Sequence, residues 1–150
     1  AKAEGVHTNL DTSGNPFTDQ EPWHSGWLEL MKYTDLVMLD IKQIDEQEHI
    51  KLTGHSNKNI LAMARELSDM KKPVWIRHVL VPGGSDKDEY LHRLADFIHT
   101  LSNVERVEVL PYHTLGKFKW ENLGLSYPLE GVNPPTQERI DNARKILGAI

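Results

Sequence analysis

The sequence feature that most constrains the fold is an apolar run that begins at Leu36 and ends in the alternating pair Asp40 and Lys42. Continuous apolar residues are typical of a strand that is buried on both faces of a parallel sheet. Side chains two positions apart in a strand share a face, so this pair is expected at the carboxyl end, where α/β folds bind ligands. The pair suits an amphoteric ligand, or a cation beside an anion. A salt bridge that closes the strand end is an equal alternative.

The composition fits one globular domain, residues 1–150, with 39% hydrophobic residues, 26% charged residues and a net charge of −5. Acidic and basic residues are interspersed, so no basic surface for nucleic acid is expected. No apolar run reaches the ~18 residues that a membrane helix needs, and no signal peptide is visible. These features predict a cytoplasmic protein that contacts neither nucleic acid nor membrane.

Cysteine is absent from the sequence, which excludes disulfides, thiolate metal sites and cysteine nucleophiles within these residues. The first residues, 1–5, contain no initiator methionine and read as the tail of a helix that runs into a strand. We therefore expect the sequence to be part of a larger protein.

Predicted strands and predicted helices alternate along the chain. Short apolar or β-branched runs followed by turn residues indicate strands, and apolar residues at helical spacing indicate helices. The strands are expected at 6–11, 34–42, 74–81 and 104–110, and the helices at 18–32, 44–52, 56–72, 85–101 and from Thr136 onward.

This alternation predicts an α/β fold whose parallel strands are joined by right-handed crossovers. Four parallel β/α units fit either a small open sheet or part of a (β/α) barrel. Polar or turn residues end all four predicted strands, which favours the barrel, because barrel sites collect at that end. Residues 114–132 have no clean period and are expected to form a long irregular loop.

Three helix starts carry a recognisable capping signal. Ser56 or Asn57 is expected to cap the helix that follows it. Ser85 with Asp88 resembles a capping box in which Asp replaces Glu. Thr136 is the expected N-cap of the last helix.

Asp11, Thr12 and Asp40 end successive predicted strands, so their oxygens are expected to lie close together. Two carboxylates, a hydroxyl and nearby carbonyls would suit a hard cation. The alternative is a simple Asx-type turn at residues 11–14, which is favoured about two to one when that segment is considered alone.

Three basic residues are candidates for the same edge. Lys42 could bind a carboxylate or a phosphate, and His113 could exchange hydrogen bonds near neutral pH. Arg77 stands in the middle of an apolar strand, and a buried Arg needs an anionic partner. It either faces a ligand or pairs with an aspartate, and the sequence gives the two alternatives even odds.

The other histidines and the tryptophans give no predicted site. No HxH or HExxH pair exists, and the tryptophans are expected in the core or an interface because a basic groove is missing. The histidines expected to be solvated are His49, His55, His92 and His99.

These segments together resemble the C-terminal part of the pyruvate formate-lyase activating enzymes, members of the radical S-adenosylmethionine superfamily. The resemblance runs along the whole chain, and the stretch Leu110 to Trp120 is its most family-specific part. The matching segments are 5–8, 10–14, 34–42, 74–77, 79–83 and 110–120.

The resemblance implies part of a (β/α)6 barrel, with this chain supplying its third to sixth strands. It also implies that Asp40, Ile41 and Lys42 contact S-adenosylmethionine, with His113 as a further contact. We expect Arg77 to face the same cavity.

A second implied site is a monovalent cation beside the carboxylate of the cofactor. Its expected ligands are Asp11, Thr12, the Met38 carbonyl and Asp40. Asn9 departs from the family pattern, which has a small or apolar residue at that position.

Two family motifs are missing from the sequence. They are the Cys-x3-Cys-x2-Cys motif of the 4Fe-4S cluster and the Gly-Gly-Glu motif that holds the amino group of the cofactor. We therefore expect the chain to begin after them, as the C-terminal portion of the domain. No catalytic residue and no cluster ligand is expected in this chain, and the chain alone is expected to be inactive.

For the intact enzyme, the resemblance implies reductive cleavage of S-adenosylmethionine and formation of a glycyl radical on pyruvate formate-lyase, a step of anaerobic glucose metabolism. The implied partners are the glycine loop of that lyase and a flavodoxin- or ferredoxin-type reductant. An activase of another glycyl-radical enzyme and a non-catalytic binding module are the alternatives. Self-association is expected through the unpaired edge of the strand at 6–11.

Overall fold

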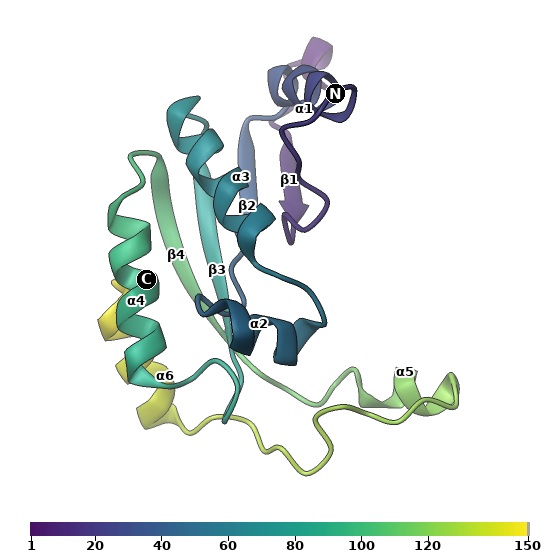
Figure 1. Cartoon of the computed structure of the whole chain (residues 1–150), viewed down its shortest axis with the longest axis vertical. Coiled ribbons are helices and arrows are strands. Elements are labelled where there is room, and N and C mark those ends of the chain that lie inside the picture. Colours follow the sequence, from purple (N-terminus) through teal and green to yellow (C-terminus); the bar gives the residue numbers. More distant parts are fainter. Residues whose placement is uncertain (150) are drawn as a thin grey trace.

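A computed structural model describes residues 1–149 of the chain. Its centre is one sheet of four parallel strands, in the spatial order β1-β2-β3-β4 (Figure 1). The strands are β1 (Asn9–Thr12), β2 (Leu36–Asp40), β3 (Val74–Leu80) and β4 (Val104–Pro111). The predicted α/β class with four parallel β/α units is confirmed.

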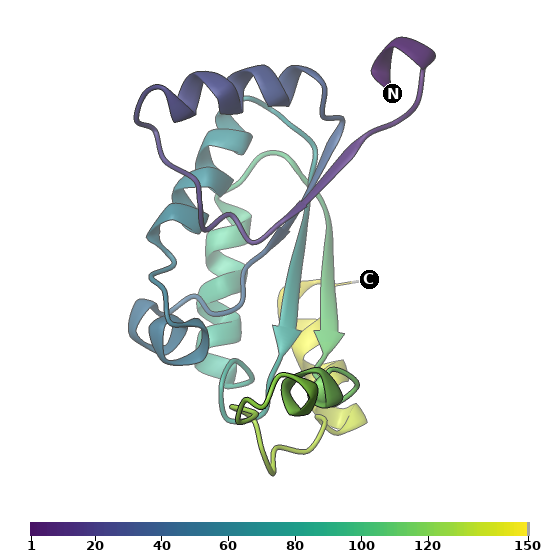
Figure 2. The ribbon, with the colours of Figure 1, turned by 90° about the vertical axis from the view of Figure 1, so that its right-hand side faces the viewer.

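Helices α1 to α4 alternate with the strands along the chain, and α6 packs against α4 and β4. Figure 2 shows helices along one face of the sheet and the short α5 near the carboxyl ends of the strands. None of the described helices is long and apolar enough to cross a membrane. The helices are α1 (Trp23–Lys32), α2 (Glu46–Thr53), α3 (Lys58–Asp69), α4 (Asp88–His99), α5 (Lys117–Asn122) and α6 (Gln137–Leu147), preceded by the 3-10 turn η1 (Lys2–Glu4).

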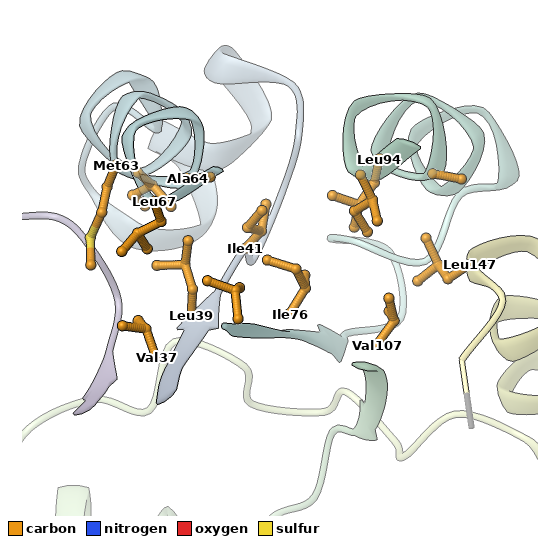
Figure 3. Close-up of a cluster of buried hydrophobic side chains, with 14 of the residues drawn as sticks. Val37, Leu39, Ile41, Met63, Ala64, Leu67, Ile76, Leu94, Val107 and Leu147 are labelled. Atoms are coloured by element: carbon orange, nitrogen blue, oxygen red, sulfur yellow. The ribbon is translucent and has the colours of Figure 1, made fainter. Parts of the chain in front are cut away.

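The hydrophobic core lies between the sheet and the helices. Alternate residues of β2 and β3 point toward α3 and α4 and are fully buried, as Val37, Leu39 and Ile76 illustrate (Figure 3). Met63 and Leu67 of α3 meet them from the helix side. Because strand side chains alternate between faces, the residues between these positions must lie on the opposite face of the sheet.

The last helix starts as predicted. The Thr136 hydroxyl accepts a hydrogen bond from the Arg139 N–H at 3.3 Å. At α2 the cap is Asp45, whose carboxylate accepts from the N–H groups of Gln47 and Glu48. Gly54 ends α2 with a φ of 80°, in the left-handed region where a side chain would be strained.

The other two predicted caps have different outcomes. Asn57 is the N-cap residue of α3, but its amide donates to the carbonyls of Gln43 and Ile44, and the Ser56 hydroxyl accepts from the Lys58 N–H at 3.2 Å.

The cap predicted at Ser85 is wrong. Ser85 is fully buried, and its hydroxyl donates to the Val79 carbonyl and accepts from the Val81 N–H. Helix α4 starts later, at Asp88, without a side-chain cap.

Two boundaries also differ from the predictions. The first strand begins at Asn9, because only its last residues reach the register of β2. A short helix, α5, lies inside the segment predicted as irregular. It is six residues long and its Phe118 remains exposed, so it leaves no periodic apolar signal in the sequence.

Candidate functional site

The charged site candidates of β1, β2 and β3 lie on the face of the sheet opposite the hydrophobic core. Asp40 pairs in register with Arg77, and Asp11 pairs with Met38, so these positions come together near the carboxyl ends of β1, β2 and β3. They alternate with core residues such as Leu39 and are less buried than those. The grouping predicted from strand ends is therefore present, and Arg77 is at its centre.

Arg77 bridges the two aspartates. Its Nε donates to Asp40 Oδ1 at 2.8 Å, and its Nη1 donates to Asp11 Oδ2 at 2.9 Å. Its Nη2 contacts the other oxygen of Asp11 and also Asp40 Oδ1, the latter at 2.8 Å. The guanidinium therefore uses its planar fork to bind both carboxylates at once.

Burial and charge oppose each other at Arg77. Partial burial lowers the pKa of its guanidinium, but the hydrogen bond to Asp11 and the charge of Asp40 outweigh this and raise the pKa above its ordinary value. The side chains of Arg77 and Asp40 are 16% and 17% exposed, whereas Asp11 is 53% exposed. The inner half of this cluster is thus shielded from water and the outer half is open.

The pair that motivated the ligand prediction is a salt bridge here. Lys42 Nζ donates to Asp40 Oδ2 at 2.8 Å. The same two residues also line a pocket of about 210 Å³, so the salt bridge and the ligand hypothesis are compatible. The remaining lining residues come from the loop after β1, from α2 with the turn after it, and from α3: Ser13, Asn15, His49, Thr53, His55 and Ile60.

The predicted cation ligands are close together, but their side-chain oxygens already accept hydrogen bonds from other residues of the chain. Both oxygens of Asp11 and both of Asp40 already contact Arg77 or Lys42. The Thr12 hydroxyl accepts from the Gly14 N–H at 3.0 Å, which agrees with the alternative of a simple turn. Within residues 1–149 no cluster of three or more His, Cys, Asp or Glu is arranged to hold a metal. In this arrangement the residues do not fit a cation unless Arg77 moves.

The last two predicted cofactor contacts differ in burial. Ile41 is fully buried, and its carbonyl accepts from His78 Nδ1 at 2.8 Å. His113 follows β4 at the same edge of the sheet and is exposed. Among the described contacts, no hydrogen bond or ion pair connects His113 to the cluster of Arg77.

Buried polar side chains fix the segment that carries Ile41 and Lys42, a role that the sequence pattern did not predict. Gln43 is 1% exposed and donates to the Gly84 carbonyl at 2.9 Å. Asn57 holds the Gln43 and Ile44 carbonyls at 3.0 and 2.8 Å. Their only signal in the sequence is that of polar residues at loop positions, which is not distinctive.

His49 was predicted to be solvated, and this is wrong. It lies on α2 and is 2% exposed. His49 is the buried residue of α2, and no periodic signal in the sequence distinguishes it from a solvated one. His55, His92 and His99 are exposed as predicted.

Comparison with known proteins gives relatives along almost the whole chain, although no protein-family model matches it. The chain is 56% identical over 147 residues to the pyruvate formate-lyase-activating enzyme of Streptococcus mutans, covering 98% of the chain and 56% of that enzyme. It is 56% identical over 146 residues to the enzyme of the same name from Staphylococcus epidermidis, covering 97% of the chain and 58% of that enzyme. The chain thus spans a little over half the length of these curated relatives.

Solved structures show the same fold. A domain of a pyruvate formate-lyase-activating enzyme from Bacteroides vulgatus matches with a TM-score of 0.76 at 22% identity, covering 98% of this chain and 78% of that one. A radical SAM methyltransferase from Sphaerobacter thermophilus matches with a TM-score of 0.62 at 19% identity, covering 93% and 37%. The resemblance inferred from the sequence is confirmed by the relatives, and these structures support the fold.

Proposed function

We propose that this chain, whose sequence is related over 97–98% of its length to pyruvate formate-lyase-activating enzymes, is the part of such an activase that holds S-adenosylmethionine. The proposed contacts are Asp40, Ile41, Lys42, Arg77 and His113. The observation that carries the proposal is the charged cluster of Asp40, Lys42 and Arg77 at the carboxyl edge of parallel strands, of which Asp40 and Lys42 line a pocket.

The chemistry of these groups suits the two charges of the cofactor. The Lys42 ammonium can bind the carboxylate of S-adenosylmethionine, and Asp40 lies beside it to balance the sulfonium or ammonium charge. Arg77 holds Asp40 in one orientation, since it binds one carboxylate oxygen and leaves the other to Lys42. When bound, the cofactor would supply the reactive carbon, and these residues would orient it.

The monovalent cation stays a prediction that requires a rearrangement. Its proposed ligands are Asp11, Thr12, the Met38 carbonyl and Asp40. Asp11 is the more exposed end of the cluster, so its release from Arg77 costs less than release of Asp40. We propose that a cation competes with Arg77 for Asp11.

The wider activity is proposed from the names of the relatives. Pyruvate formate-lyase is the proposed partner, with a flavodoxin- or ferredoxin-type reductant and a 4Fe-4S cluster in the full activase. The chain has no cysteine to bind that cluster, so we expect it to form no 5′-deoxyadenosine by itself. Formation of 5′-deoxyadenosine by this chain after cluster reconstitution would contradict the proposal.

Self-association is proposed separately, through β1. This strand is four residues long and lies at one end of the sheet order, and within residues 1–149 no strand pairs with its outer edge. Light scattering at high concentration should detect a dimer, and a monomer at every concentration would rule this out.

The second candidate is a structural role, in which the cluster only closes the strand ends. It is favoured by the engagement of every carboxylate oxygen of Asp11 and Asp40. Calorimetry of S-adenosylmethionine binding separates the two candidates. The ligand role predicts binding to the wild-type chain, loss of binding in Asp40→Ala, and no change in Asp96→Ala, whose side chain is exposed on α4. Equal binding by all three proteins, or by none, would favour the structural role.

A further inference from the structure

Glu108 is a carboxylate beside Arg77 that does not take part in the charged cluster. The two residues are partners in the register of β3 and β4, and both lie on the face of the sheet opposite the core. Neighbouring strands are about 4.8 Å apart, so the Arg77 guanidinium can reach Glu108. Among the ion pairs of residues 1–149, Arg77 binds Asp11 and Asp40, whereas Glu108 binds a different arginine.

The arginine that Glu108 binds is Arg106, and this pair lacks an aligned hydrogen bond. Arg106 Nε lies 3.0 Å from Glu108 Oε1, yet this buried N–H has no hydrogen-bond partner among the described residues. The Arg106 guanidinium also lies over the ring of Trp75, 4.9 Å from its centroid. A carboxylate can accept about four hydrogen bonds, and the Glu108 side chain is only 22% exposed to water. Glu108 can therefore accept hydrogen bonds from a second guanidinium.

Glu108 and the two aspartates lie on opposite sides of Arg77. The order of the sheet places β1 and β2 on one side of β3, and β4 on the other. A guanidinium that turns toward Glu108 therefore leaves both Asp11 and Asp40. The salt bridge of Lys42 does not depend on Arg77, because Lys42 binds the other oxygen of Asp40, at 2.8 Å.

We propose that Arg77 is a switch with two positions, and that Glu108 is the positioning residue that holds the second one. While both aspartates are charged, Arg77 binds them, as in this structure. When a cation neutralises the aspartates, the guanidinium turns to Glu108 and frees their oxygens for the cation. A ligand shifts such an equilibrium through its different affinity for the two positions, and the aspartate oxygens are free in one position alone.

This switch deepens the proposed function, and it rests on that function only for the cation. The cation ligands Asp11 and Asp40 are both bound to Arg77, so a cation can take them only if the guanidinium leaves. The Arg77 side chain is 16% exposed, and a shielded charge that loses its partner is strongly destabilising. Glu108 provides a new partner on the same face of the sheet, which removes most of this cost.

The first test neutralises the aspartates without any cation. In the double variant Asp11→Asn with Asp40→Asn, NMR should detect a nuclear Overhauser contact between the Arg77 Hε proton and the Glu108 side chain. The wild type should lack this contact, and so should Asp96→Asn, a matched change at an exposed position of α4. A folded double variant without the contact overturns the inference.

The second test uses a cation and does not depend on the folding of the double variant. Sodium or potassium chloride, titrated against tetramethylammonium chloride at constant ionic strength, should shift the Arg77 Nε resonance of the wild type. Glu108→Gln should weaken the apparent cation affinity by about tenfold, the equivalent of one hydrogen bond to a charged group. Glu105→Gln, at an exposed position of β4, should leave the affinity unchanged. Equal affinity in a folded Glu108→Gln overturns the inference.

The rescue variant Glu108→Asp should restore most of the cation affinity, because it returns a carboxylate to β4. Circular dichroism checks that each variant folds. If the double variant shows the contact while the wild type responds to neither salt, the cation site of the proposed function fails and the switch stands. If calorimetry detects no binding of S-adenosylmethionine, the cofactor role fails, and the contact between Arg77 and Glu108 still decides the switch.

Discussion

The two faces of the sheet use the same strands for different purposes. On the helix-covered face, Val37, Leu39 and Ile76 are completely buried within the apolar core (Figure 3). On the opposite face, Asp40 and Arg77 are adjacent in register and hold each other by charge. Neighbouring residues of β2 therefore serve either the core or the charged cluster, depending on the face.

The contrast between the two faces indicates which residues mainly determine stability and which mainly determine ligand binding. Apolar burial scales with the area removed from water and needs no exact partner. A charge cluster needs each partner in place, because removal of one leaves the others desolvated and unpaired. Substitutions on the covered face should therefore change stability first, and substitutions on the charged face should change ligand binding more than stability.

The largest effect is expected on the covered face. Leu39→Ala removes a fully buried side chain and should lower the free energy of unfolding by about 2–5 kcal/mol, because it creates a cavity. Denaturant unfolding measures it. Leu115→Ala, at a position that is 75% exposed, is the control and should change stability little. Similar losses in the two variants would contradict the assignment of this face as the core.

A smaller loss is expected on the charged face. Arg77→Leu leaves Asp40 without its guanidinium partner and should cost about 1–3 kcal/mol of unfolding free energy. Asp11→Asn should cost less than about 1 kcal/mol, because that pair is the exposed one. Denaturant unfolding of the two variants measures both losses. If the Asp11 variant were less stable than the Arg77 variant, the shielded pair of Arg77 and Asp40 would not be the stronger half of the cluster.

The smallest effect concerns pH, and it arises at His78 behind the cluster. Burial lowers the pKa of this imidazole below 6.5, opposed by its hydrogen bonds to the Ile41 and Ser85 carbonyls and assisted by the charge of Lys42. The unfolded chain then binds the proton more readily than the folded chain. The contribution of neutral His78 to the free energy of unfolding is therefore complete above pH 6.5. It is lost as the pH falls toward the lowered pKa of the folded state.

Denaturant unfolding measured above and below pH 6.5 tests whether stability falls with falling pH. The wild type should lose stability on the acid side, and His78→Gln should show a flatter profile. His92→Gln, on an exposed surface, should keep the profile of the wild type. A His78→Gln profile as steep as that of the wild type would assign the acid loss to other groups.

The sequence predicted the covered face better than the charged one, for a physical reason. Burial repeats every second residue in β3 and every third or fourth in α3, so periodicity alone is enough to locate the core. Asp40 and Lys42 were found because they interrupt such a pattern. The pairing of Arg77 with two aspartates could not be decided, because it depends on the register of three strands.

The buried polar residues His49 and Ser85 gave no periodic signal in the sequence. His49 was missed because a single buried polar residue on a short helix looks like a solvated one. Ser85 was predicted as a cap, but its hydroxyl serves the strand end of β3 instead. Both belong to buried polar contacts between segments that a local pattern does not encode.

The most direct test of a ligand site on the charged face is to map amide NMR shifts of the chain during titration with S-adenosylmethionine. Shifts concentrated at Asp40, Ile41, Lys42 and Arg77, and absent in Asp40→Ala, are the expected result. Shifts confined to the helix-covered side, or no shift at saturating cofactor, would contradict the account and leave the cluster as a structural closure of the strand ends.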